Sequence, residues 1–478
     1  MSAEISRSTR RSGKRFVRLF SGTVAILAVV VGALTAANFT QGPRLTSAEI
    51  NLEGAVARSG QRLLLQTNQP LVSVDEKQVT VEPKTDVTAT VADSAITIQF
   101  AGILRYNTTY TVKVRGVQGT SQDATSTLEH SFTTPDSDIY SLQRDVRVDD
   151  AGLKLPDTIR RTTILGRGSG EAVFSAPRIQ EYGVLSDALA VVTIGEDETT
   201  SLEIGSLSGA EQVQVPLPTE GIVKRLRTAA SENLIAYTFT SSPTAPGPKY
   251  RDTPFIFDLA AGSGIPTEVA GLDGRPMSVV DLDFIPGTTS LVVQAEDENV
   301  FLLDALKEGK EGTLTPLGQH SEIRGFIPGT KELVVADPTQ GGTIDLTDGT
   351  VTVLDLAESV LSDTAYPGQL VLLDGQGRYA RQFDQESTDT TEMISAITLT
   401  DDNASKIVYQ TASESSRVRN FCVSPNGQFL AAEIFSTDGK SDSYPNLPAT
   451  TGLTIVLNDL ETGASNRSIS GFLPGWCR

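Results

Sequence analysis

The sequence VSPNGQFLAA, residues 423–432, contains the turn that decides the fold of most of this chain. Pro425 presets the backbone angle φ, and Gly427 permits the positive φ that a tight turn requires. An apolar run, Phe429 to Ala432, begins two residues after this glycine. A Pro-Gly turn that leads directly into an apolar run predicts a β-hairpin.

Similar turns recur along the chain after residue 136. In each, an aromatic residue stands at or near a proline-glycine pair, and an apolar run follows all of them except the last. The turns are DFIPG (283–287), GFIPG (325–329), YPG (366–368), NFCVSPNG (420–427) and GFLPG (471–475). Their prolines are 42, 39, 58 and 49 residues apart. A repeat of this length with three or four strands is typical of a β-propeller blade.

The repeat also resembles the blades of TolB-type β-propellers, in which S-P-D-G lies between two strands and V-x-D-L-x-T-G follows. Residues 423–431 and the segment DLETG (459–463) carry this resemblance. It implies a WD40-like β-propeller over residues 137–478. We expect seven blades, with six or eight as alternatives.

The sequence also indicates how the ring closes. The last repeat ends soon after Trp476, so its blade lacks later strands. Strand-like segments at 162–165 and 172–175 precede the first full repeat. We expect these segments to complete the last blade, because pairing strands from both ends removes an exposed sheet edge.

Residues 44–136 show short runs of alternating apolar and polar residues, separated by turns at intervals of about ten residues, which predicts a β-sandwich. The runs LLLQTNQPLVSVDEKQVTVEP (63–83) and LRYNTTYTVKVRGVQGTSQDATSTLEHSFTTPD (104–136) resemble a bacterial Ig-like domain of the S-layer-associated type. The chain departs from that family in the V-Q-G turn, where Gln118 or Gly119 replaces the family's Asp. The resemblance implies a spacer or adhesion role without catalytic residues.

The N-terminus predicts a membrane segment. Residues 1–18 are basic, and the uncharged residues that follow include the apolar stretch TVAILAVVVGALTAA (23–37). We expect a cytoplasmic segment at 1–18 and a transmembrane signal anchor at 19–39, because about 20 apolar residues cross a bilayer and basic residues stay inside. A cleavable signal peptide, with its site at 35–37, is the alternative. The predicted location is therefore the cell membrane, single-pass, or secretion after cleavage.

The chain has two cysteines, Cys422 and Cys477. In an exported protein an even pair favours a disulfide, whereas a spacing of 55 residues matches no metal or redox motif. We expect this disulfide to tie the last two blades together, with free thiols as the alternative.

Motifs for catalysis or metal binding are absent from the sequence. His130 and His320 have no second ligand at metal spacing, and there is no Gly-x-Ser-x-Gly motif. The glycine-rich run 166–170 lacks the lysine of a phosphate loop. The acidic segments 196–198 and 296–299 fit solvated turns better than calcium loops. We therefore predict no catalytic, cofactor-binding or metal-binding residue and no cofactor.

The overall charge restricts the partners. The chain carries −20, and residues 1–43 carry six positive charges and one negative charge, so the rest is more acidic still. Such a surface repels phosphates and argues against nucleic acid. The prediction is an all-β, membrane-anchored extracytoplasmic binding or scaffold protein of the bacterial cell envelope. Its partner would be an envelope protein or polysaccharide, bound on one propeller face or in the central channel. A propeller hydrolase or lyase acting on an envelope polymer is the alternative.

Overall fold

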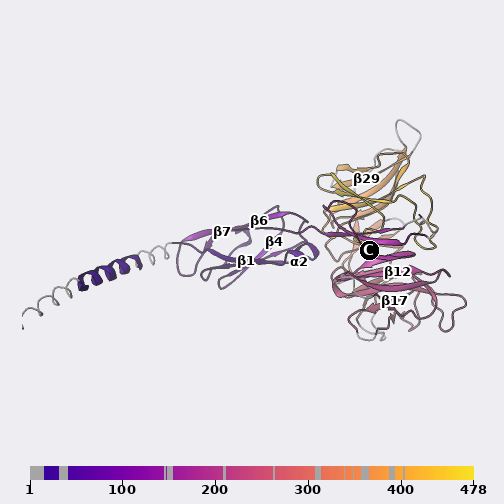
Figure 1. Ribbon diagram of the computed structural model, residues 1–478, viewed down its shortest axis with the longest axis horizontal. Coiled ribbons are helices and arrows are strands. Elements are labelled where there is room, and N and C mark those ends of the chain that lie inside the picture. The colour runs from indigo at the N-terminus through magenta and orange to yellow at the C-terminus, as the bar shows by residue number, and fades with distance from the viewer. Residues whose placement is uncertain are drawn as a thin grey trace, which may run out of the picture. The chain divides into compact units, whose positions relative to one another are not determined.

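The structure is a computed structural model of the 478-residue chain. It consists of two compact units, Met1–Pro135 and Asp136–Arg478, which are described separately (Figure 1). The residues that it describes are 16–31, 41–144, 147, 154–207, 212–261, 264–306, 314–337, 340–347, 349–356, 365–386, 393–401 and 404–477.

A helix covers residues 16–31, and its apolar side chains are exposed, for example Leu19 at 73% and Ile26 at 66%. Within the described residues, no helix combines the length and the apolar character that a membrane crossing requires. The predicted segment 19–39 extends beyond this helix, and its residues 32–39 lie outside the described part of the chain. The membrane anchor therefore stays a prediction.

The first unit contains two antiparallel sheets that share one apolar core. One sheet has the order β1-β2-β5-β4 and the other β3-β6-β7. The strands are β1 Leu45–Ile50, β2 Arg62–Thr67, β3 Val79–Glu82, β4 Val87–Ala92, β5 Ala95–Phe100, β6 Thr109–Gln118 and β7 Thr125–Thr133. Helix α2 (Leu52–Ala57) begins at Asn51, whose side chain accepts a hydrogen bond from the Gly54 N–H, and a short 3-10 helix η1 covers Glu76–Gln78. Alternation along β5 puts Ile96, Ile98 and Phe100 in the core, as the sequence pattern predicts.

The two sheets of this unit form an antiparallel β-sandwich. Tyr110, at the start of β6, accepts a hydrogen bond at its hydroxyl from the Arg105 N–H at 3.0 Å, which ties this strand to the preceding loop. Membership of the S-layer-associated Ig-like family stays a prediction.

The described residues of the second unit form seven antiparallel sheets, each built from consecutive strands. The three-stranded sheet consists of β8 Asp138–Gln143, β9 Asp157–Thr163 and β10 Glu171–Ala176. The next three sheets consist of β11 Ile179–Val184, β12 Ala188–Ile194, β13 Thr200–Ser206, β14 Val213–Val215; β15 Gly221–Ala229, β16 Leu234–Ser241, β17 Thr253–Asp258, β18 Thr267–Glu268; and β19 Val279–Phe284, β20 Ser290–Ala295, β21 Asn299–Asp304, β22 Thr315–Gln319. A short 3-10 helix η2, Ala230–Glu232, lies between β15 and β16.

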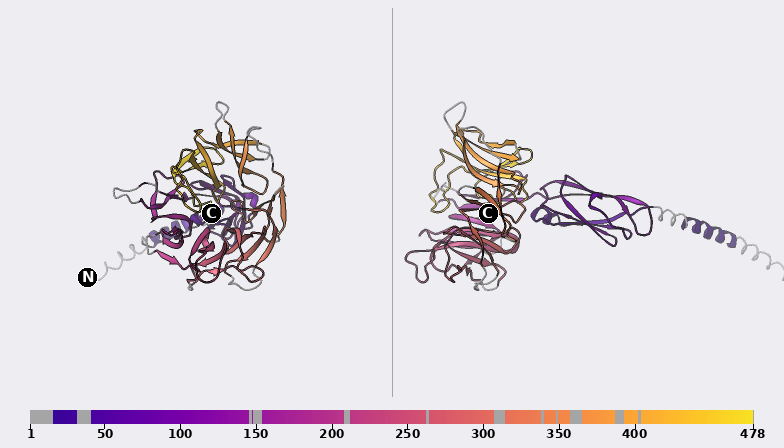
Figure 2. Two further views of the ribbon diagram at one scale, coloured as in Figure 1. Left: turned by 90° about the vertical axis from the view of Figure 1, so that its right-hand side faces the viewer. Right: turned by 180° about the vertical axis from the view of Figure 1, so that it is seen from behind.

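The last three sheets consist of β23 Glu322–Phe326, β24 Leu333–Asp337, β25 Gln340–Ile344, β26 Val351–Leu354; β27 Tyr366–Leu372, β28 Tyr379–Glu386, β29 Met393–Asp401, β30 Ala404–Gln410; and β31 Ser416–Val423, β32 Phe429–Ser436, β33 Thr454–Asp459, β34 Ser465–Ser470. The sheets follow one another around a common centre (Figure 2, left). The first strands β11, β15 and β19 contact their neighbours in the ring, so the first strand of each of these sheets is the innermost. This arrangement is a β-propeller with seven blades, the number that the sequence repeat predicts.

Strand β16 is buried on both faces, between the neighbouring blades. In β16, Ile235, Tyr237 and Phe239 pack into one core cluster, while Leu234 and Ala236 pack into the next. This explains why the strand has a continuous apolar run rather than an alternating pattern.

The turn at residues 423–432 is the hairpin that the sequence predicts. It joins β31 to β32, and Gly427 has a positive φ of 70°. The buried Ser424 hydroxyl accepts hydrogen bonds from the N–H groups of Gln428 and Phe429. Asp459, which begins the later DLETG segment, accepts from the N–H groups of Glu461 and Thr462 and so fixes the following turn.

Strands from both ends of the second unit close the ring, as expected. Phe472 and Leu142 of β8 exchange two backbone hydrogen bonds of 2.9 and 3.0 Å, so the C-terminal segment adds an inner strand to the three-stranded sheet. The disulfide joins Cys422 of β31 to Cys477, with their Cα atoms 5.4 Å apart. It therefore connects the sixth four-stranded blade to the closing blade.

Candidate functional site

The innermost strands of the six four-stranded blades share a local irregularity. Strands β11, β15, β19, β23, β27 and β31 each have a shift of register against the second strand of their blade. A β-bulge of this kind changes the direction in which side chains point. Several of the residues within these shifts are polar: Gln180, Arg225, Arg324, Gln369 and Arg419.

Three of these bulge residues line a cavity of about 650 Å³ in the second unit. Its wall consists of side chains from β11, β15, β31 and β32, the loop at 445–447, and the closing segment. The residues that line it include Gln180, Glu181, Lys224, Arg225, Arg227, Arg419, Glu433, Asn446, Leu473 and Cys477. A volume in this range is typical of sites for small molecules. We call it the central cavity.

Strand β15 supplies three positive charges to the central cavity, Lys224, Arg225 and Arg227. Strict alternation would place Lys224 on the opposite face from the two arginines, but the register shift between Lys224 and Arg227 brings all three to the cavity. Lys224 and Arg225 approach Asp252 at 3.4 and 3.5 Å. Arg227 approaches Asp281 at 3.4 Å. These ion pairs are longer than the 2.7–2.9 Å of strong charge-assisted hydrogen bonds.

The backbone of Arg225 adopts a left-handed conformation, with φ of 49°. A side chain other than glycine costs about 1–2 kcal/mol there. The buried carboxylate of Glu181 on the neighbouring β11 accepts a hydrogen bond from the Leu226 N–H at 3.4 Å, next to the bulge. The neighbouring blade therefore helps to hold this strained turn of the chain.

On the other side of the central cavity, Glu433 joins two parts of the wall. This buried residue of β32 accepts hydrogen bonds from Arg419 at 2.8 Å and from the Leu473 N–H at 2.7 Å. Arg419 therefore keeps its guanidinium beside the cavity, and the carboxylate also fixes the closing segment.

Two amide side chains in the cavity wall have buried polar atoms without a hydrogen-bond partner among the described residues. Gln180 is fully buried, and neither its Nε2 nor its Oε1 has a hydrogen-bond partner among these residues. The Nδ2 atom of Asn446 is also buried and has no such partner. An unsatisfied buried polar group costs about 1–3 kcal/mol, so a polar ligand that paired with these atoms would recover that energy.

A buried arginine holds the loop that carries Asn446. The Arg144 guanidinium pairs with Asp442 at 2.6 Å and donates to the carbonyl oxygens of Gln180 and Leu447. It also lies 3.8 Å from the centre of the Tyr444 ring. Burial lowers the pKa of Arg144, while the bond to Asp442 opposes that shift. This cluster gives the cavity rim a rigid support.

Asp283 lies on the adjacent inner strand β19, and its pKa differs from the ordinary value of an aspartate. Burial raises its pKa to about 6; the Arg227 charge lowers it, and Asp281 raises it further. Asp283 is absent from the lining of the central cavity.

The residues singled out in the sequence do not assemble into a catalytic or metal centre. His130 stacks on Phe132 in the first unit, and His320 is buried with Nδ1 3.4 Å from Asp337. The described residues contain no cluster of three or more His, Cys, Asp or Glu side chains arranged to hold a metal ion. The acidic segments 196–198 and 296–298 are exposed hairpin tips.

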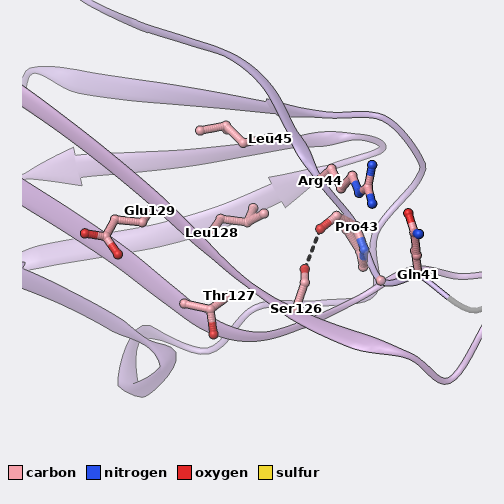
Figure 3. Close-up of a pocket in the computed structure, with 9 residues that line it drawn as sticks. Gln41, Pro43, Arg44, Leu45, Ser126, Thr127, Leu128 and Glu129 are labelled. Atoms are coloured by element: carbon pink, nitrogen blue, oxygen red, sulfur yellow. Dashed lines mark hydrogen bonds between the residues drawn. The ribbon is translucent and has the colours of Figure 1, made fainter.

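The first unit has a second hollow, of about 410 Å³, between the start of β1 and the strand β7 (Figure 3). The Ser126 hydroxyl donates a hydrogen bond across it to the Pro43 carbonyl. Its charged side chains, Arg44 and Glu129, are exposed. This hollow has none of the buried unpaired groups of the central cavity, so the central cavity is the candidate site.

The sequence reasoning identified Cys477 but missed the other lining residues. The available clue was the segment KRLR (224–227), which places three cations within four residues of one strand. The bulges that bring these residues together depend on pairing between strands, which a single sequence does not show.

Neither a family model nor a curated protein sequence matches this chain. It is similar in structure to the Cps50 (Swd1) β-propeller domain of Myceliophteria thermophila, with 12% identity over 61% of this chain and 89% of that one, at a TM-score of 0.34. A putative 6-phosphogluconolactonase from Bacteroides fragilis is 13% identical over 71% and 97%, at 0.40. A post-proline cleaving enzyme from Rickettsia typhi is 9% identical over 67% and 51%, at 0.42. The class of protein defined by the sheets themselves is a β-propeller that follows a two-sheet sandwich, and these distant likenesses add no activity to it.

Proposed function

We propose that this protein is a membrane-anchored extracytoplasmic binding protein of the bacterial cell envelope, and that its ligand binds in the central cavity. The observation that carries the proposal is the polar wall of that cavity, where Gln180 and Asn446 present buried atoms without protein partners. Loops and strand ends at the centre of a propeller commonly form binding sites, because several blades contribute to them.

The exposed apolar helix over 16–31, the basic residues before it and the disulfide support the proposed location. The helix over 16–31 exposes its apolar side chains, and the basic residues that precede it favour a cytoplasmic N-terminus. The disulfide between Cys422 and Cys477 fits an oxidising compartment. In this proposal the first unit is a bacterial Ig-like spacer between the membrane and the propeller.

Two measurements test this function. Protease added to intact spheroplasts should cleave the full chain outside the membrane, and protection until lysis would refute the location. Envelope components captured by the full chain in detergent should be lost with an Arg225→Ala, Arg419→Ala variant. Equal capture by both proteins would show that the central cavity is not the site.

A second candidate function is an extracytoplasmic propeller hydrolase or lyase acting on an envelope polymer. Its candidate general acid is Asp283 on the inner strand β19, where burial raises the pKa to about 6 and the nearby Arg227 charge opposes that shift. This candidate predicts that the full chain releases fragments from isolated envelope polymer, and that Asp283→Asn abolishes the release. Equal release by the two proteins would exclude a role for Asp283.

A further inference from the structure

We propose that the ligand of the central cavity is a small organic anion, which binds through carboxylate or phosphate oxygens to Arg225 and Arg227 and through a hydroxyl or amide group to Gln180 and Asn446. This inference rests on the proposed function, since it concerns the same site, and it specifies the chemistry of the ligand.

The charge of the wall is the first argument. The central cavity is lined by four cations, Lys224, Arg225, Arg227 and Arg419, and by two carboxylates, Glu181 and Glu433. The lining residues therefore carry more positive than negative charge, although Lys224, Arg225 and Arg227 also pair with Asp252 and Asp281, which do not line the cavity. Both carboxylates already accept hydrogen bonds from the protein, Glu181 from Leu226 and Glu433 from Arg419. A wall of this sign, with its carboxylates engaged, favours a negatively charged ligand.

The geometry of the cations is the second argument. The side chains of Arg225 and Arg227 are 36% and 22% exposed, and their ion pairs with Asp252 and Asp281 are 3.5 and 3.4 Å long. A guanidinium has five N–H donors in a planar fork that matches two oxygens of a carboxylate or phosphate. Arg227 also donates to the Leu226 carbonyl at 3.1 Å, and both arginines still have N–H donors left for a ligand anion.

The conformation of Arg225 is the third argument. An arginine stands where glycine would be free of strain, and Glu181 of the neighbouring blade supports the adjacent peptide. Strained non-glycine residues are concentrated at functional sites. A requirement for the guanidinium in ligand binding would explain why an arginine, and not a glycine, occupies this position.

The amides define the rest of the ligand. The side chain of Gln180 can both donate and accept, and Asn446 presents a free N–H₂ group. A hydroxyl group satisfies both roles, so a hydroxylated acid fits this wall better than a simple anion.

The test uses the full chain and isothermal titration with four probes: glucuronate, citrate, inorganic phosphate and glucose. Glucuronate and glucose have the same ring but differ in charge. Trp476 is the single tryptophan of the chain, and it precedes Cys477, which lines the cavity. Its fluorescence provides a second readout of binding. We expect at least one organic anion to bind, glucuronate to bind more tightly than glucose, and phosphate to bind more weakly than the organic anion.

Variants locate the binding. Arg225→Ala and Gln180→Leu should each weaken the affinity about tenfold or more, the effect of losing a hydrogen bond to a charged or buried group. Arg324→Ala is the matched control, because Arg324 lies in the corresponding bulge of β23 but is not in the cavity wall. It should leave the affinity unchanged.

Three outcomes would overturn the inference: no binding of any organic anion, binding of glucose as tight as that of glucuronate, or equal weakening by Arg324→Ala and Arg225→Ala. Tighter binding of inorganic phosphate than of the organic acids would also contradict the role of the amides. Failure here is separate from failure of the proposed function. Capture of an envelope component that depends on the cavity, without competition by anions, would retain the function and exclude the anion.

Discussion

Replacing Arg225 by glycine should remove a binding group and relieve the backbone at the same time. Arg225 has φ of 49°, and this left-handed conformation costs an arginine about 1–2 kcal/mol. Glycine avoids that cost, but it lowers the stability of the folded state by about 0.5–1 kcal/mol because the unfolded chain has more freedom at a glycine. The appropriate reference is Arg225→Ala, because both variants lose the 3.5 Å contact with Asp252 equally.

The difference in unfolding free energy between the two variants therefore reports only the effect of the backbone conformation at residue 225. We expect Arg225→Gly to be more stable than Arg225→Ala by about 0.5–1 kcal/mol, the strain relieved less the entropy of glycine. Against the wild type, Arg225→Gly should be close to neutral or slightly stabilised, since a half-exposed ion pair contributes only about 0–1 kcal/mol. Both variants should lose affinity for organic anions to the same extent.

Urea unfolding followed by Trp476 fluorescence measures these differences. The matched control is Glu198, an exposed turn residue with φ of 63°, where glycine should again be more stable than alanine but ligand binding should stay unchanged. The glycine variant could have a larger free energy of unfolding than the alanine variant at Glu198 but not at Arg225. That result would show that Arg225 is not strained.

Three further predictions concern the rest of the molecule. Replacing Cys422 and Cys477 by serine should destabilise the propeller by about 4 kcal/mol, the chain entropy of a 55-residue loop, in urea unfolding; a loss below about 1 kcal/mol would contradict this. Burial raises the pKa of Asp283 from 3.8 to about 6, so between these pH values the folded state binds the extra proton and stability falls as pH rises. Asp283→Asn should therefore be more stable than the wild type at pH 7.5, by up to about 3 kcal/mol, and this gain should vanish near pH 4; a gain independent of pH would refute the shift. Tyr110→Phe removes the hydrogen bond from the Arg105 N–H and should destabilise the first unit by about 1–2 kcal/mol, without effect on the unfolding of the propeller.

Much of the fold follows from local sequence patterns. The turn at Pro425 and Gly427 forms the predicted hairpin because both residues restrict or extend the range of φ at their own positions. Closure of the ring was also predictable, because the turn at 471–475 repeats the pattern of the earlier blades and strand-like segments precede the first full repeat. These features depend on residues that are near one another or that repeat at a regular spacing.

The candidate site could not be predicted in the same way. Arg144 and Asp442, which hold the cavity rim, are 298 residues apart, and nothing in either local sequence indicates their pairing. The lining cations depend on bulges, which shift a strand by one or two residues and reverse the expected side-chain direction. The composition does not indicate this group of cations either, because the chain as a whole is acidic.

The segment that closes the ring has a consequence for biosynthesis. Phe472 supplies the inner strand beside β8, and Leu473 and Cys477 form part of the cavity wall. During synthesis these residues are added after those of every strand from β8 to β34. Blades that fold earlier must wait as an open arc, with β8 unpaired on its inner side. The binding site therefore comes into existence only when synthesis has passed Cys477, and a chain that stops before residue 471 has neither a closed ring nor a complete wall for the ligand.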